Sequence, residues 1–172
     1  MVNNKQEFQE VLKDKKITSA LIGPGNGVNN ETKARVLMAL AFIDHVVLDA
    51  DALTVFANNP DELFIDCYPH TILTPHEGEF NKIFGAKISN IEDKVLRTTE
   101  AAKKSNTIVV LKGADTIIAA PSGEVVINKS SAVYLATAGS GDVLAGIIAS
   151  LVGNNKMKAC LLYTSPSPRD VE

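Results

Sequence analysis

The chain has 172 residues, 45% of them hydrophobic and 22% charged, with a net charge of −3 at pH 7, which predicts one soluble globular domain with a sizeable core. It has no Trp and no basic cluster, and this argues against nucleic acid or an anionic membrane as a partner. We expect a cytoplasmic protein, because the chain has no signal core, no membrane-length apolar run and only two isolated cysteines.

Short apolar runs and amphipathic segments alternate along the chain. After a weak helix at 3–15, we expect strands at 17–22, 45–50, 71–74 and 107–111, separated by helices at 31–42, 51–59, 77–84 and 91–104. The segment 116–128 predicts a β-hairpin that turns at 121–123, and the last helix begins near Gly141. This order is typical of an α/β fold, a three-layer αβα arrangement whose mostly parallel sheet has an antiparallel pair near one edge.

Ligands of such sheets bind at the carboxyl ends of the strands. The first strand ends in GPGNG (23–27), whose glycines let the backbone approach a ligand; an ordinary strand-to-helix turn is the alternative. Asp49 and Asp51 share one side of the next strand end, where they could bind substrate hydroxyls or hydrated Mg²⁺. In the alternative interpretation, Asp51 caps the following helix and Asp49 hydrogen-bonds a neighbouring loop.

The third and fourth strand ends also carry polar groups. His76 in TPHEGEF (74–80) either faces a polar ligand or is a surface or capping histidine, and the spacing does not suggest zinc. Lys112 opens the turn Lys112-Gly113-Ala114-Asp115-Thr116, where it could pair with a phosphate to which Thr116 donates its hydroxyl. The alternative for this segment is a glycine turn with a solvated lysine.

Residues 136–148, ATAGSGDVLAGII, place glycines and one carboxylate ahead of an apolar helical run. We expect the N–H groups of Gly139, Ser140 and Gly141 to form an anion hole at the helix N-terminus, with Asp142 as a base that accepts a proton from a hydroxyl. Phosphoryl transfer to an alcohol needs both of these groups. A helix N-cap after a flexible turn is the alternative, but four polar or glycine-rich strand ends together favour a binding crevice.

These segments, taken in order, resemble one family. LIGPGNG, VLDADAL, TPHEGEF, VVLKGADT and ATAGSGDVLAGII look like the ADP/ATP-dependent NAD(P)H-hydrate dehydratases of the ribokinase-like fold, over about residues 17–152. The resemblance implies removal of water from the 6S hydrate of NADH or NADPH at the expense of ADP or ATP. It also implies Mg²⁺ beside the nucleotide phosphates and a homo-oligomer, a tetramer, in the full-length protein.

The resemblance also assigns roles to residues. Asp142 would be the catalytic base, and no residue is expected to be a metal ligand. The hydrate would contact Gly25, His76 and Asp142. The nucleotide would contact Lys112, Gly113, Ala114, Asp115, Thr116 and Gly141.

The chain departs from the family pattern at several points. Thr54 stands where the family usually has Asn, and KSSAVYL (129–135) replaces a Thr-Gly-Asn-rich stretch. Family members begin with a further glycine- and alanine-rich region and continue beyond Val152. We therefore interpret residues 1–152 as a partial domain truncated at both ends. Residues 153–172 are interpreted as a non-native or disordered tail, which resembles translated sequencing-adaptor DNA from about residue 160.

Two other functions remain open. A small-molecule kinase of the same superfamily, of the hydroxymethylpyrimidine or thiazole type, would use the same anion hole and base but release a stable phosphate ester. A non-catalytic nucleotide-binding module would bind ADP without turnover. The positioned carboxylate and the TPHEGEF segment weigh against the module.

Overall fold

A computed structural model of the protein describes residues 5–128 and 139–154. One sheet of six strands runs through the described chain, and its strands lie side by side in sequence order. The first four strands are parallel, whereas the last two add an antiparallel hairpin at the edge, so the predicted α/β class and its hairpin are confirmed. The strands are β1 (Ser19–Ile22), β2 (His45–Leu48), β3 (Ile72–Leu73), β4 (Ile108–Leu111), β5 (Thr116–Ala119) and β6 (Val125–Asn128).

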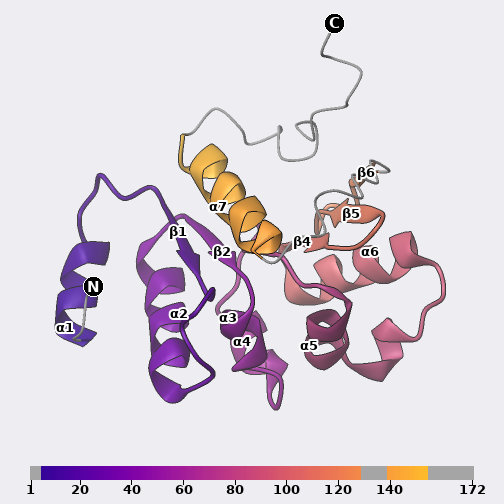
Figure 1. Ribbon diagram of the computed structural model, residues 1–172, viewed down its shortest axis with the longest axis horizontal. Helices are drawn as coiled ribbons and strands as arrows, with labels where there is room; N and C mark the ends of the chain where they lie inside the picture. The colour runs from indigo at the N-terminus through magenta and orange to yellow at the C-terminus, as the bar shows by residue number, and fades with distance from the viewer. Residues whose placement is uncertain (1–4, 129–138, 155–172) are drawn as a thin grey trace, which may run out of the picture.

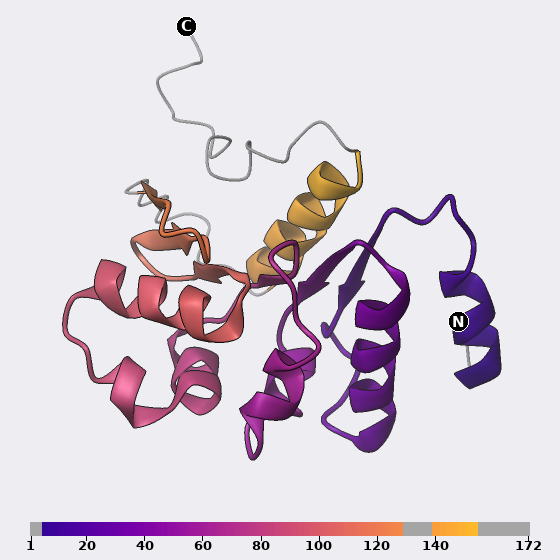
Figure 2. The ribbon, with the colours of Figure 1, turned by 180° about the vertical axis from the view of Figure 1, so that it is seen from behind.

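The helices divide between the two faces of this sheet. Parallel strands in consecutive order, joined by right-handed crossovers, place every connecting helix on one face. Figure 1 shows α2 to α6 on that face and α7 alone on the other, and Figure 2 shows α1 beyond α2 at the β1 edge. The helices are α1 (Lys5–Leu12), α2 (Asn30–Phe42), α3 (Asp51–Thr54), α4 (Pro60–Phe64), α5 (Glu77–Ser89), α6 (Lys94–Ser105) and α7 (Ser140–Gly153).

Each face of the sheet has its own apolar core, because successive side chains of a strand point to opposite faces. Val46 and Leu48 of β2 pack in the larger core with the connecting helices. Val47 packs in the smaller core, which α7 completes with Ala145, Ile148, Ala149 and Val152. The three layers are therefore present, and α7 alone forms the third layer among the described residues.

Several element boundaries differ from the prediction. The expected helix at 51–59 is shorter, and a second helix, α4, begins at Pro60, which suits the first turn because proline has no N–H to leave unbonded. Helix α5 is helical as far as the predicted stop at Gly85, whose φ of 69° and ψ of 171° are non-helical, and a further turn follows. Helix α6 begins at Lys94 because the Asp93 side chain accepts hydrogen bonds from the N–H groups of Val95 and Leu96.

Some predictions fall on residues outside the described part of the chain: the start of the helix at 3–15 (residues 3–4), residues 129–138, and the predicted tail from residue 155 onward. None of the helices in the described part of the chain has the length and hydropathy that crossing a membrane requires.

We expect Gly23→Ala to destabilise the fold by about 2 kcal/mol or more. Gly23 has φ +133°, and a Cβ there would lie 1.7 Å from the carbonyl oxygen of Asp49, so the β1 and β2 ends would have to separate. Gly123→Ala is the matched control, because Gly123 has φ +98° but open space around a Cβ, and we expect it to cost about 1 kcal/mol. Urea unfolding of both variants measures the difference, and equal losses would contradict the steric argument.

We also expect the Cys67 thiol to be inert in the folded protein. Burial raises its pKa from 9.0 to about 12, Asp66 adds to the rise, and a hydrogen bond with Thr71 opposes it. Because the folded state holds this proton more tightly, the thiol contributes stability below about pH 9 that is lost as the pH rises toward 12.

The measurement is iodoacetamide alkylation of a Cys160→Ser variant, in which Cys67 is the remaining thiol. At about pH 8 the folded variant should react far more slowly than the same variant in urea. Equal rates in the two conditions would contradict the burial of the thiol.

Candidate active site at the carboxyl ends of the strands

A buried ion pair joins the ends of β2 and β4. Asp49 is 1% exposed and follows β2, and its Oδ1 accepts a hydrogen bond of 2.7 Å from Nζ of Lys112, which follows β4. The same Oδ1 accepts from the N–H of Ala50 at 2.9 Å. Lys112 is therefore not the solvated lysine of the alternative interpretation.

The end of β3 lies between these two residues and holds the Lys112 backbone. The N–H of Lys112 donates to the carbonyl of Pro75 at 2.9 Å, and Lys112 pairs with His76 in an isolated parallel bridge. Three adjacent strand ends are thus tied together by one residue.

His76 is the N-cap of α5. Its Nδ1 accepts from the N–H groups of Gly78 and Glu79, and the Glu79 carboxylate accepts from the N–H of His76, which completes a capping box. The His76 side chain is 60% exposed, and because Nδ1 is occupied by the cap, Nε2 is the nitrogen left for other contacts; it lies 3.4 Å from Oε1 of Glu79. His76 is therefore a capping histidine, as one of the sequence alternatives stated, and its imidazole remains largely exposed.

The GPGNG loop is held firmly by its neighbours. The N–H of Gly27 donates to Oδ2 of Asp51 at 2.8 Å, and the Thr32 hydroxyl bonds to the carbonyls of Asn26 and Gly27. Asp51 does not cap the following helix with its side chain, so it holds the loop while Asp49 holds Lys112. Gly25 is exposed at the tip with φ +67° and open space around it.

The N-terminus of α7 lies against the Lys112 ammonium. Gly139 is the N-cap with φ +87°, its carbonyl accepts the hydrogen bond from the N–H of Val143, and no side chain of residues 5–128 or 139–154 caps the helix. The N–H groups of Ser140, Gly141 and Asp142 come before that first helical bond, so they have no hydrogen-bond acceptor within the helix. A Cβ on Gly141 would lie 3.4 Å from Nζ of Lys112, an ordinary van der Waals distance, so the start of α7 lies close to this ammonium. Gly139, unlike Gly141, has a positive φ that favours glycine.

The Asp142 side chain belongs to the first turn of α7, and the residue is exposed. It directly follows Gly141, the residue at which a Cβ would lie 3.4 Å from Nζ of Lys112. The structure therefore brings together the ends of β1 to β4 and the start of α7 at one edge of the sheet, the edge that the sequence predicted.

The segment 112–116 connects β4 to β5 as expected. Gly113, Ala114 and Asp115 are exposed, and the Thr116 hydroxyl lies 3.4 Å from the carbonyl of Gly113, a long contact. Lys94 of α6 reaches this segment and donates to the carbonyl of Asp115. Lys94 was not predicted from the sequence. A lysine in the first turn of a helix could have indicated a partner elsewhere, because the helix dipole disfavours a cation there.

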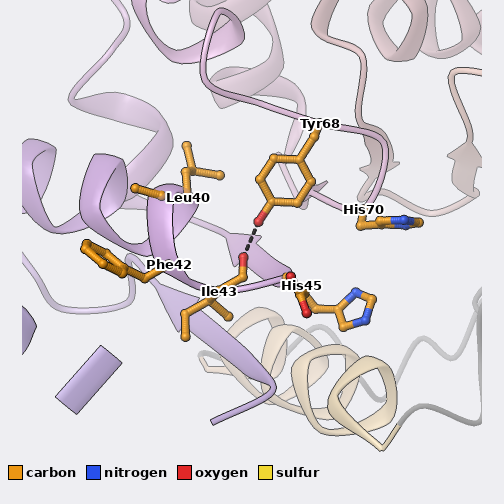
Figure 3. Close-up of a pocket in the computed structure, with 8 residues that line it drawn as sticks. Leu40, Phe42, Ile43, His45, Tyr68 and His70 are labelled. Carbon is orange, nitrogen blue, oxygen red and sulfur yellow. Dashed lines mark hydrogen bonds between the residues drawn. The ribbon is translucent and has the colours of Figure 1, made fainter. Parts of the chain in front are cut away.

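A cavity of about 480 Å³ lies at the opposite edge of the sheet, where β2 and β3 begin. Figure 3 shows Tyr68 donating its hydroxyl to the carbonyl of Ile43, with His45 and His70 at one side. Burial, followed by the charge of Asp44, raises the pKa of the Tyr68 hydroxyl to about 12. With its hydroxyl bonded and neutral, Tyr68 is not a proton acceptor, and this cavity lacks the glycine loops and helix start that the other edge has.

Comparisons with known proteins agree with this architecture. A family model described as NAD(P)H-hydrate dehydratase matches residues 1–165. The bifunctional NAD(P)H-hydrate repair enzyme Nnr of Mycobacterium leprae is 39% identical over 137 residues, 80% of this chain and 28% of the relative. Nnr of Thermofilum pendens is 38% identical over 152 residues, 87% of this chain and 28% of the relative. The chain thus spans 28% of the length of these curated relatives.

Solved structures give the same result. The ADP/ATP-dependent NAD(P)H-hydrate dehydratase from Bacillus subtilis, co-crystallised with ATP and Mg²⁺, is 26% identical with a TM-score of 0.66, covering 86% of this chain and 52% of its own. A ribokinase-like superfamily protein from Enterococcus faecalis is 26% identical with a TM-score of 0.71, covering 84% of this chain and 50% of its own. The fold is therefore ribokinase-like, and the chain belongs to the NAD(P)H-hydrate dehydratase family.

Proposed function

We propose that this protein dehydrates the 6S hydrate of NADH or NADPH at the expense of ADP or ATP. The observation that carries the proposal is the uncapped N-terminus of α7 against the Lys112 ammonium. Backbone N–H groups, a helix dipole and a lysine meet there, and each of them attracts a phosphate group. Family membership supplies the substrate class.

The nucleotide phosphates would bind between the segment 112–116 and the start of α7. Lys112 has three N–H donors, of which one is bonded to Asp49, so others remain for phosphate oxygens. The N–H groups of residues 139–141 would stabilise charge on the transferred phosphoryl group. Gly25 and His76, at the neighbouring strand ends, would contact the hydrate.

Asp142 would act as the base. It takes the proton from the hydroxyl on C6 of the hydrated ring, and that oxygen attacks the terminal phosphorus of the nucleotide, releasing AMP from ADP or ADP from ATP. The C6–O bond then breaks, phosphate leaves with help from the ring nitrogen lone pair, and loss of a proton from the adjacent carbon restores the dihydropyridine. Phosphate is a far better leaving group than hydroxide, which is why a nucleotide is needed.

Mg²⁺ would accompany the nucleotide, as in the Bacillus subtilis structure. Among the described residues there is no cluster of three metal-binding side chains, and Asp49 and Asp51 already accept hydrogen bonds from Lys112 and Gly27. This donor set fits an ion held mainly by phosphate oxygens and water, as Mg²⁺ commonly is. When bound, the ion would neutralise negative charge on the phosphates.

We also propose a cytoplasmic homo-oligomer, a tetramer, for the full-length protein. Val143 and Ile147 on α7 are 62% and 52% exposed, so this helix offers an apolar surface for assembly. Light scattering on the complete protein would measure the assembly, and a monomeric mass would reject it.

Product analysis tests the reaction and separates the three functions. The protein is incubated with hydrated NADH, Mg²⁺ and either ADP or ATP. Return of the near-ultraviolet absorbance of NADH, with stoichiometric phosphate, supports the dehydratase. A phosphorylated alcohol without that absorbance indicates a kinase, and nucleotide binding with neither product indicates a binding module.

We expect Asp142→Asn to lower turnover by ~10²-fold or more, because the amide cannot accept the hydroxyl proton. The exposed position of Asp142 predicts an unchanged melting temperature. Asp44→Asn removes the same charge at the opposite edge of the sheet and should leave turnover unchanged. Near-normal turnover in Asp142→Asn, measured by NADH absorbance, would reject the assigned role.

We expect Lys112→Met to lower the free energy of unfolding by about 3–5 kcal/mol, because it leaves the buried Asp49 carboxylate unpaired. Adding Asp49→Asn to this variant should restore most of the loss. Lys33→Met, which breaks the more exposed pair with Glu62, should cost less than about 1 kcal/mol. Denaturant unfolding measures all three, and a double variant no more stable than Lys112→Met would contradict the ion-pair argument.

A further inference from the structure

Lys94 contacts the segment that connects β4 to β5 from the neighbouring helix. Its Nζ donates to the carbonyl of Asp115, and a Cβ on Gly113 would lie 2.7 Å from that Nζ. Lys94 therefore occupies the space that a side chain at 113 would need. The hydrogen bond and the close approach place this ammonium against the turn at two backbone positions, Asp115 and Gly113.

The position of Lys94 in its helix needs a tertiary explanation. It is the first residue of α6, directly after the N-cap Asp93, and the helix dipole disfavours a cation there. Glu77 lies 3.8 Å from its Nζ, but Glu77 makes a closer pair with Arg97. Lys94 therefore interacts more closely with the backbone of residues 113–115 than with the Glu77 carboxylate.

We propose that Lys94 is a positioning residue for the nucleotide, which orients the turn 113–116 to receive phosphate. The carbonyl and N–H of one planar trans peptide point in opposite directions, so anchoring the Asp115 carbonyl on Lys94 fixes the direction of the Thr116 N–H. The ammonium also adds a second cation, besides Lys112, close to this turn. This inference rests on the proposed function, because it takes the turn as the nucleotide segment.

Removing the Lys94 ammonium should weaken nucleotide binding for two reasons. Removing the ammonium frees the turn, and nucleotide binding must then order it. The same change removes positive charge beside a polyanion. Both consequences weaken nucleotide binding, and neither alters the hydroxyl or the base at the reacting atoms.

The test is calorimetric titration of Mg·ADP into Lys94→Met, Lys94→Arg and Lys103→Met. We expect Lys94→Met to raise Kd by about three- to tenfold. Lys94→Arg keeps a charged donor and should recover most of the affinity. Lys103→Met removes the same charge from the exposed C-terminal turn of α6 and should bind as the unaltered chain does.

Turnover separates positioning from a structural role. Lys94→Met should raise KM for the nucleotide with kcat within about twofold, at an unchanged melting temperature, because Glu77 keeps its pair with Arg97. Unchanged Kd in Lys94→Met, or equal weakening in Lys94→Arg, would overturn the positioning role and leave the proposed function intact. Failure of the unaltered chain to bind ADP or ATP would overturn both.

Discussion

The ion pair between Asp49 and Lys112 is the interaction on which the arrangement of the candidate site depends. It joins residues 63 positions apart; the Lys112 N–H also donates to the backbone beyond β3, and the Lys112 ammonium lies close to the start of α7. A buried ion pair adds little net stability, but removing one partner is costly because the other charge stays desolvated. Its value here is positional: a flexible lysine is held in one orientation before any ligand arrives.

The strand order explains why this edge of the sheet can hold a site. Since β1 to β4 are parallel and consecutive, their carboxyl ends meet along one edge, and the loops that follow them become neighbours. Helix α7 then crosses the face that no other described helix covers and brings its N-terminus to the same edge.

Much of the site follows from local patterns. Glycine-rich or polar segments directly after apolar strands identified all four strand ends, and a glycine-rich run before an apolar segment identified the start of α7. The roles within the segments were harder, since a lone sequence does not specify partners. Asp49 and Asp51 were expected either to bind a ligand together or to act as loop partner and helix cap, yet Asp49 binds a distant lysine and Asp51 a loop N–H. Lys94 was missed because its partner is a backbone carbonyl on another element.

The sequence by itself determined the alternation of strands and helices, the hairpin, the positions of the polar and glycine-rich segments after the strands, and the family. These depend on hydrophobic periodicity, turn residues and short motifs, all of which are local. Only the tertiary structure decided that Lys112 is paired with Asp49 rather than solvated and that α7 begins close to the Lys112 ammonium. Those outcomes depend on which side chains long-range packing brings within a few ångströms, and no local pattern encodes that distance.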